Sequence, residues 1–171
     1  MVTTATSFVV VVSGCGNIAV PDFGLAQPLV AANGHTIGFW RNVHGRALVS
    51  QYGILATLPA LCLVGANGVY VAPATLNAWA SYLQNANAVN MAYMLSAQLA
   101  AMHCNVIVGF VSPNAVIHDS VLGNITIANL MQQARASLCL YSYTPTGHPQ
   151  RAAQEVLKTA LDRANNNQNW L

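Results

Sequence analysis

Charged residues are scarce in this chain. Only ten of its 171 residues are Asp, Glu, Lys or Arg, whereas a soluble domain carries roughly a quarter of its residues in charged form. Five of the ten lie in one stretch, between Arg151 and Arg163. The other polar residues are mostly amides, with 16 Asn and 9 Gln. A surface with so little charge meets water through amides and hydroxyls or is covered, which favours an extracellular protein, a subunit that packs against copies of itself, or a membrane-associated protein.

The few basic residues form no cluster or stripe along the sequence. Binding to the phosphates of a nucleic acid needs several such residues together, so we expect no nucleic-acid partner. The spacings typical of metal sites are missing as well, because the chain has no Cys-x-x-Cys, His-Glu-x-x-His or His-x-His. We expect no cofactor.

The four cysteines, Cys15, Cys62, Cys104 and Cys139, lie far apart in the sequence. In an exported chain an even number permits two disulfides, with three possible connectivities. The alternative is that they are buried free thiols, which behave as small hydrophobic residues. The sequence leaves both possibilities open.

An apolar run precedes the first cysteine. Val12-Ser13-Gly14-Cys15 resembles a bacterial lipobox, in which a signal peptide is cut before a cysteine that is then lipidated. The segment lacks a positively charged start and its apolar run is short for a signal peptide. Residues 8–12 also have the β-branched composition of a buried strand. We therefore expect a mature domain without its export signal, and membrane association only through a lipid anchor at Cys15.

The chain is predicted to form a single, mainly α-helical domain over residues 1–171. A chain of this size buries roughly 70% of the surface that its unfolded state exposes. Residues 1–33 are predicted as a strand and loop segment, and residues 34–171 as a helical core that bears the sequence motifs. We expect about five helices, with a few short β-strands near the N-terminus and between helices.

Helices are predicted where a capping side chain precedes apolar residues at a 3.6-residue period. The longest, from Met91 to about Asn105, is apolar almost all round, which is typical of a helix that is buried on every side or spans a membrane. Its Gln98 and His103, and the absence of flanking Lys or Arg, favour burial. The predicted helices follow Asn42, Thr75, Asn87 or Asn90, Thr126 and Pro149.

The last of these helices is predicted to face solvent. Arg151 with Glu155, and Lys158 with Asp162, stand four residues apart, which is the spacing of stabilising ion pairs on a helix. Residues 1–40 are predicted as strand and loop, and residues 55–73 as an apolar stretch interrupted by turns. Short strands or extended connections are predicted at residues 8–12, 69–71, 106–111 and 115–117.

Groups that can carry chemistry are concentrated in residues 34–46, which hold two His, two Arg, one Trp and three Gly. His35, His44 and Arg41 are candidate catalytic residues. The candidate metal ligands are His35, His44, His103 and His118, with Cys104 or Asp119 as partners. No two of these histidines have the spacing of neighbours on a helix, so histidines that only hydrogen-bond within the fold are the favoured alternative. The candidate binding residues are Trp40, Asn42, Asn90, Gln98 and Trp170.

The chain ends in an amide-rich tail, Asn165-Asn166-Asn167-Gln168-Asn169-Trp170. These amides suit a helix C-terminus, because Asn tolerates the left-handed conformation there. They also suit hydrogen bonds back to residues 34–45, with Trp170 docked as an apolar plug. Glycan binding is the alternative, because amides with Trp and Tyr suit polyol recognition. We expect the His35–Arg46 segment and this tail to meet in the folded protein.

Three stretches together resemble a family of secreted bacterial proteins. They are the Gly34-His-Thr-Ile-Gly-Phe-Trp40 motif, residues 87–102 and the Asn-rich tail from residue 157 to residue 170, so the resemblance extends over most of the chain. It implies export and an extracellular or cell-surface setting. It implies no particular activity.

The sequence therefore predicts an exported bacterial protein of the cell surface or extracellular matrix. We expect it to self-associate, as a homo-oligomer or filament, or to bind a partner such as a polysaccharide. The alternative is a small secreted enzyme, a hydrolase or a metal-dependent enzyme, with a site centred on His35, His44 and Trp40. Such an enzyme needs His35, a second titratable group and a cleft within hydrogen-bond reach of one another.

Overall fold

The computed structural model describes residues 32–171 and shows a single, mainly helical unit, as the sequence predicts. The described residues form six α-helices, one 3₁₀ helix and a two-stranded antiparallel sheet. The elements are α1 (Ile37–Arg41), α2 (Val43–Gln51), η1 (Ile54–Leu61), α3 (Leu76–Gln84), α4 (Met91–Val108), β1 (Val116–Asp119), β2 (Gly123–Thr126), α5 (Ile127–Leu140) and α6 (Arg151–Asn165). The predicted strand at residues 8–12 and the candidate lipid anchor at Cys15 lie outside the described residues.

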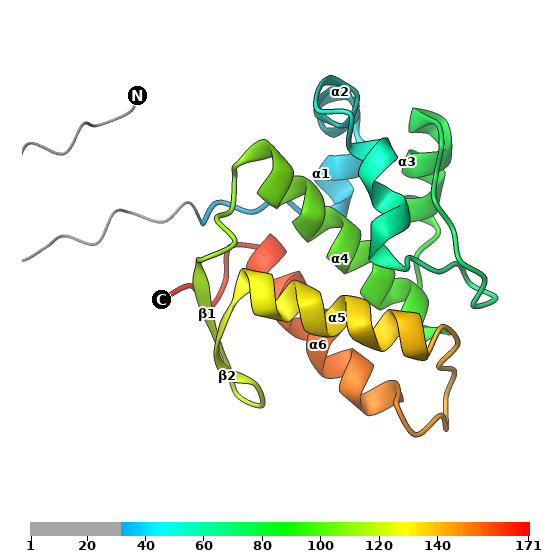
Figure 1. Ribbon diagram of the computed structural model, residues 1–171, viewed down its shortest axis with the longest axis vertical. Coiled ribbons are helices and arrows are strands. Elements are labelled where there is room, and N and C mark those ends of the chain that lie inside the picture. Colours follow the sequence, from blue (N-terminus) through cyan, green and yellow to red (C-terminus); the bar gives the residue numbers. More distant parts are fainter. Residues whose placement is uncertain (1–31) are drawn as a thin grey trace, which may run out of the picture.

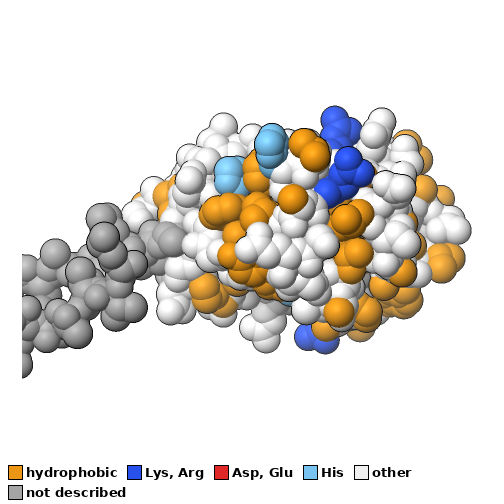
Figure 2. Space-filling model, turned by 90° about the horizontal axis from the view of Figure 1, so that it is seen from above, with side chains coloured by type: hydrophobic (Ala, Val, Ile, Leu, Met, Phe, Trp, Pro, Cys, Tyr) orange, Lys and Arg blue, Asp and Glu red, His pale blue; other side chains and the backbone are white. Residues whose placement is uncertain are grey.

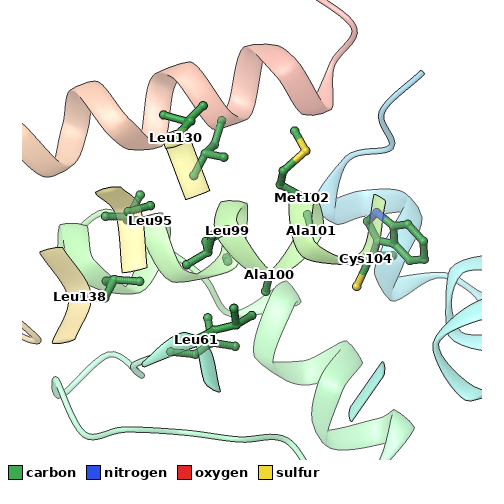
Figure 3. Packing of buried hydrophobic residues seen from close by; sticks show 14 of the residues in the cluster. Leu61, Leu95, Leu99, Ala100, Ala101, Met102, Cys104, Leu130 and Leu138 are labelled. Carbon is green, nitrogen blue, oxygen red and sulfur yellow. The ribbon is translucent and has the colours of Figure 1, made fainter. Parts of the chain in front are cut away.

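Helix α4 runs through the centre of the fold, with α1 and α3 on one side and α5 and α6 on the other (Figure 1). Figure 3 shows Leu99 of α4 between Leu130 of α5 and Leu61 of η1. Among the described residues, α4 is the one helix long and apolar enough to cross a membrane, and 72% of it is buried inside the fold. It is thus the central core helix that its composition favours.

Capping side chains fix the helix starts at the predicted positions. Asn42, Thr75, Asn90 and Thr126 each accept a hydrogen bond from a backbone N–H in the first turn of α2, α3, α4 and α5. Helix α4 ends at Gly109, whose φ of +85° lies in the left-handed region that favours glycine. The predicted extended segment at 106–111 is wrong over residues 106–108, because the helix continues to this first glycine.

Two short helices form where the sequence predicts strand, loop or turns. Helix α1 has only five residues, too few to show a helical period, and its signal is Thr36, whose Oγ1 accepts a hydrogen bond from the Phe39 N–H at 3.4 Å. The 3₁₀ helix η1 begins after Gly53 and ends before Cys62, both in the left-handed conformation. The strand predicted at residues 69–71 is reduced to one bridge, between Val64 and Tyr70.

The β-hairpin and the C-terminal tail lie side by side. Strands β1 and β2 pair antiparallel, with Val116 opposite Thr126, so the strand predicted at residues 115–117 falls at the start of β1. Trp170 forms an antiparallel bridge with Ile117, and the backbone N–H of Leu171 donates to the Val116 carbonyl. The backbone of Trp170 is therefore held beside β1, whereas we expected this residue to dock onto residues 34–45.

A disulfide joins the end of η1 to the end of α5. It links Cys62 and Cys139, which are 77 positions apart in the sequence. Cys104 is a buried free thiol on α4, and burial raises its pKa. The described cysteines thus include both a disulfide and a buried free thiol, the two possibilities that the sequence leaves open.

Candidate functional site

Three buried amide side chains connect α4 to α6, and we call them the Asn105 cluster: Gln98, Asn105 and Asn165. Asn105 and Asn165 are fully buried, and Gln98 is 4% exposed. Asn105 Nδ2 donates to Asn165 Oδ1, and Asn165 Nδ2 donates to Gln98 Oε1, both at 2.9 Å. A buried amide without such partners costs about 1–3 kcal/mol, so the chain of bonds is what allows amides in an apolar core.

Asn105 also holds the start of the motif segment against α4. Its Oδ1 accepts hydrogen bonds from the His35 backbone N–H at 2.8 Å and from Trp40 Nε1 at 3.2 Å. Its Nδ2 donates to the His35 carbonyl at 2.9 Å. The Asn105 side chain therefore pairs with both the backbone N–H and the carbonyl of His35, as a neighbouring strand would, and it also fixes the indole of Trp40.

The C-terminal tail reaches the same segment. Asn167 Nδ2 donates to the Gly34 carbonyl at 3.1 Å. A Cβ atom on Gly34 would lie 2.7 Å from the Ala164 carbonyl oxygen, so only glycine permits this approach. The predicted meeting of the His35–Arg46 segment with the Asn-rich tail is therefore present in the structure.

A cleft of about 490 Å³ lies beside the Asn105 cluster, between one face of α4 and one face of α6. Its volume is within the range of small-molecule sites. The residues around the start of α1 form a third side. The lining residues are Thr36, Ile37, Gly38, Ala88, Met91, Met94, Gln98, Glu155, Lys158, Asp162 and Asn166. The three stretches that carry the sequence resemblance thus converge on this cleft.

Asp162 is the most constrained charged residue in the cleft. Its Oδ1 accepts hydrogen bonds from Gln98 Nε2 at 3.0 Å and from Asn166 Nδ2 at 3.1 Å. Its Oδ2 has no hydrogen-bond partner among the described residues. Because Gln98 is itself held by Asn165, the Asn105 cluster positions this carboxylate and leaves one of its oxygens free.

The ion pairs predicted along α6 do not form. Among residues 32–171 the one salt bridge joins Arg163 to Asp119, at 3.7 Å. The guanidinium of Arg151 donates instead to the carbonyls of Ala88 and Thr144, at 2.7 and 3.0 Å. Those carbonyls lie in the loops before α4 and α6, and the Thr144 carbonyl also accepts a hydrogen bond from the Met91 backbone N–H at the start of α4. The charges of Glu155, Lys158 and Asp162 consequently remain available at the cleft.

A second set of buried polar side chains lies at the other end of α4, and we call it the Asn90 cluster: Asn90, Thr144 and Gln154. Asn90 Oδ1 accepts from the backbone N–H of Thr144 at 2.8 Å and its Nδ2 donates to two loop carbonyls. Thr144 Oγ1 donates to Gln154 Oε1, and Gln154 Nε2 donates to the Tyr141 carbonyl. All three side chains are buried and internally satisfied.

The structure places the predicted binding residues in different environments. Trp40 is fully buried and Asn90 is 1% exposed, so neither is available to a ligand. The reason in both cases is that the side chain completes hydrogen bonds inside the core. Asn42 caps α2, and Trp170 is partly buried beside β1. Only Gln98 lines the cleft.

The candidate histidines lie in separate environments. The His35 ring stacks on Phe39 with 4.0 Å between ring centres, and burial lowers its pKa. His103 Nε2 lies 2.7 Å from Thr57 Oγ1, and burial lowers its pKa as well. His44 is exposed, and His118 Nδ1 lies 2.8 Å from Asn124 Oδ1.

Among the described residues, these histidines do not come together as ligands of one metal site. Residues 32–171 contain no group of three or more His, Cys, Asp or Glu side chains placed to hold a metal ion. Neither His35 nor His44 hydrogen-bonds the other, and Arg41 is exposed. Cys104 is buried in α4 with a raised pKa, which makes its thiol unreactive.

Apart from Gln98, sequence reasoning missed the residues that line the cleft. Asn105 carried the clearest signal, because it is an amide inside an otherwise apolar helix and therefore needs partners. Glu155 and Asp162 were assigned to ion pairs instead. Comparisons of the chain with models of protein families, with curated proteins and with solved structures gave no match.

Proposed function

We propose that this is an exported surface or extracellular protein that acts by binding a small polar ligand in the cleft between α4 and α6. The observation that carries the proposal is the placement of charge. Three of the chain's ten charged residues, Glu155, Lys158 and Asp162, line this one cleft. None of the three forms a salt bridge among the described residues.

The unpaired state of these charges supports a binding role. On a helix, opposite charges three or four residues apart normally stabilise one another by a few tenths of a kcal/mol. Here the carboxylate of Asp162 is held instead by two amides. Positioning of this kind lowers the ordering cost of binding, because the group is already fixed before the ligand arrives.

Export is supported by the Cys62–Cys139 disulfide. Disulfides persist outside the cytosol and are rare within it. The resemblance of the three motif stretches to secreted bacterial proteins agrees with this setting.

An enzyme centred on His35, His44 and Trp40 has less support. Trp40 is fully buried, and the ring of His35 is stacked against Phe39. No other titratable side chain of the described residues hydrogen-bonds to either histidine ring. The requirement for a second titratable group within reach of His35 is therefore not met in this geometry.

Methionine methyl groups provide a direct test of ligand binding. Met91 and Met94 line the cleft, whereas Met102 is buried elsewhere on α4 and Met131 lies on α5. With ¹³C-methyl-methionine protein, a library of amino acids, peptides and sugars should include compounds that shift the Met91 and Met94 signals and leave the other two in place. A library of which no member moves Met91 or Met94 would overturn the proposed function.

Self-association is a second candidate function, favoured by a different surface. The tyrosine face, which we define as Val69, Tyr70, Leu140, Tyr141 and Tyr143, consists of exposed apolar and aromatic side chains. The disulfide and the hydrogen bond from Tyr70 OH to the Cys139 carbonyl bring its two halves together. The low charge of the surface can also be followed in Figure 2, where hydrophobic side chains lie among uncharged groups and a few Lys or Arg side chains, and no Asp or Glu is visible. Low net charge removes repulsion between copies.

Light scattering with a matched pair of variants tests self-association. Leu140 and Val121 are 73% and 70% exposed, but only Leu140 belongs to the tyrosine face. We expect the wild-type chain to associate at micromolar concentration with little dependence on salt, because few ion pairs contribute. Leu140→Lys should weaken the association and Val121→Lys should not. A wild-type protein that stays monomeric at all concentrations and salt levels would contradict this second function.

A further inference from the structure

The charges of the cleft alternate in sign along one face of α6. Glu155, Lys158 and Asp162 stand three and four residues apart, so their Cβ atoms lie roughly 5–6 Å from one another in sequence order. The face therefore presents a negative, a positive and a second negative group in a row. A ligand of complementary pattern carries a positive, a negative and a positive group.

Apolar side chains occupy the opposite wall. Met94 of α4 and Ile37 of α1 contribute thioether and aliphatic surface to the cleft, whereas Met91, which also lines it, is only 2% exposed and adds little. No aromatic ring is among its lining residues. Stacking on Trp or Tyr, which suits sugar rings, is therefore absent from this wall, and an aliphatic side chain fits it better.

Two neutral hydrogen-bonding side chains, Thr36 and Asn166, also line the cleft. The Thr36 hydroxyl accepts from the Phe39 N–H, which leaves its O–H proton free to donate. Asn166 uses its Nδ2 on Asp162, which leaves its Oδ1 free to accept. One free donor and one free acceptor match the C=O and N–H of a single peptide group.

We propose that the cleft binds a basic dipeptide with free termini. The inference rests on the proposed binding function of the cleft and names its ligand class. The N-terminal ammonium group binds the free Oδ2 of Asp162, and the C-terminal carboxylate binds the Lys158 ammonium. The side-chain ammonium of a C-terminal Lys or Arg binds Glu155, and the aliphatic part of that side chain packs against Met94, close to the buried Met91. A cleft of about 490 Å³ accommodates a ligand of this size.

The probe that fits this description most simply is Ala-Lys. Added to ¹³C-methyl-methionine protein, it should shift the Met91 and Met94 signals in a saturable manner. Ala-Ala should bind more weakly, because it lacks the group for Glu155. The same Ala-Lys peptide with an acetylated N-terminus and an amidated C-terminus should lose at least tenfold in affinity. Affinity for Ala-Lys should fall as salt is raised, because its contacts are ionic and partly exposed.

Charge-neutralising variants locate each contact. Asp162→Asn and Lys158→Gln should each weaken Ala-Lys binding at least tenfold, and Glu155→Gln should abolish the advantage of Ala-Lys over Ala-Ala. Arg135→Gln, at an exposed position of α5 outside the cleft, is the matched control and should bind like the wild type. Lys158 makes no hydrogen bond among the described residues, so Lys158→Gln remains informative if Asp162→Asn folds poorly.

The outcomes separate this inference from the proposed function. If maltotriose or another neutral sugar shifts Met91 and Met94 while Ala-Lys does not, the cleft is a binding site and the dipeptide assignment is wrong. The same conclusion follows if the blocked peptide binds as well as Ala-Lys. If no compound of any class shifts the two methyl groups, both the inference and the proposed function fail.

Discussion

The two buried polar clusters at α4 are built from the same kind of hydrogen bonds but have different roles. In the Asn90 cluster, amide and hydroxyl groups bond to one another and to loop carbonyls, and all three side chains are buried. In the Asn105 cluster, the chain of amides continues from Asn165 through Gln98 to Asp162, which lines the cleft. One cluster is closed, and the other ends at a charged group with a free oxygen.

The difference shows how an almost charge-free chain can build a specific site. Burying an amide requires partners, and once the partners are in place the amide is rigid. The closed cluster uses that rigidity to hold the loops before α4 and α6. The open cluster uses it to fix Asp162, so damage to it should affect both stability and binding.

The largest effect on the free energy of unfolding is expected from loss of the Cys62–Cys139 disulfide. This disulfide belongs to the same part of the fold as the closed cluster. Closing a loop of 77 residues stabilises a protein by about 4–5 kcal/mol in the chain-entropy view. Urea unfolding of a Cys62→Ala/Cys139→Ala double variant should show a loss of that order, while Ala-Lys binding to the folded variant stays within about twofold of wild type. A variant with unchanged unfolding free energy would mean that the disulfide adds no constraint.

A smaller effect is expected from truncating one amide in each cluster. Asn105→Ala and Gln154→Ala each leave several buried groups without partners, at about 2–4 kcal/mol of unfolding free energy. Only Asn105→Ala should also weaken Ala-Lys binding, because Asn105 holds Asn165 and, through it, Gln98. Asn129→Ala, at an exposed position of α5, is the control for both measurements. Equal binding by the two truncated variants would remove the distinction between the clusters.

The smallest effect is a dependence of stability on pH near the open cluster. Burial lowers the pKa of His35, whose backbone is bonded to Asn105, and also that of His103. As the pH falls through the ordinary value of 6.5, the unfolded chain takes up protons before the folded protein does, so the unfolding free energy decreases. Denaturation between about pH 7.5 and pH 5.5 should show this loss.

Variants identify the histidines responsible. His35→Phe and His103→Gln should each reduce the loss of stability between the two pH values, while His44→Gln, at an exposed position, serves as control. Stability that rises as the pH falls through this range would contradict a lowered pKa for these two partly buried histidines.

Local signals in the sequence were sufficient for the long helices. Thr75, Asn90 and Thr126 cap α3, α4 and α5 as predicted, because a cap and a helical period act within a few residues. Helix α1 was missed because five residues show no period. The end of α4 was placed too early because Val106 and its neighbours are β-branched, yet the helix continues until Gly109.

The cleft could not be predicted from the sequence, because its three sides come from segments far apart in the chain. The ion pairs expected on α6 were inferred only from the four-residue spacing of Arg151 with Glu155 and of Lys158 with Asp162. Tertiary contacts override it, because Arg151 meets loop carbonyls and Asp162 meets Gln98. Prediction reached Gln98 as a binding residue, and the meeting of the motif segment with the Asn-rich tail, since both are polar islands in an apolar chain.

The most direct test of the account is a crystal structure of the full chain grown with Ala-Lys. We expect density for the dipeptide between α4 and α6, with its N-terminal ammonium within hydrogen-bond distance of Asp162 Oδ2 and its carboxylate at Lys158. A cleft closed by a Lys158–Asp162 ion pair, or a dipeptide bound elsewhere on the protein, would contradict the claim that these charges are kept apart for a ligand.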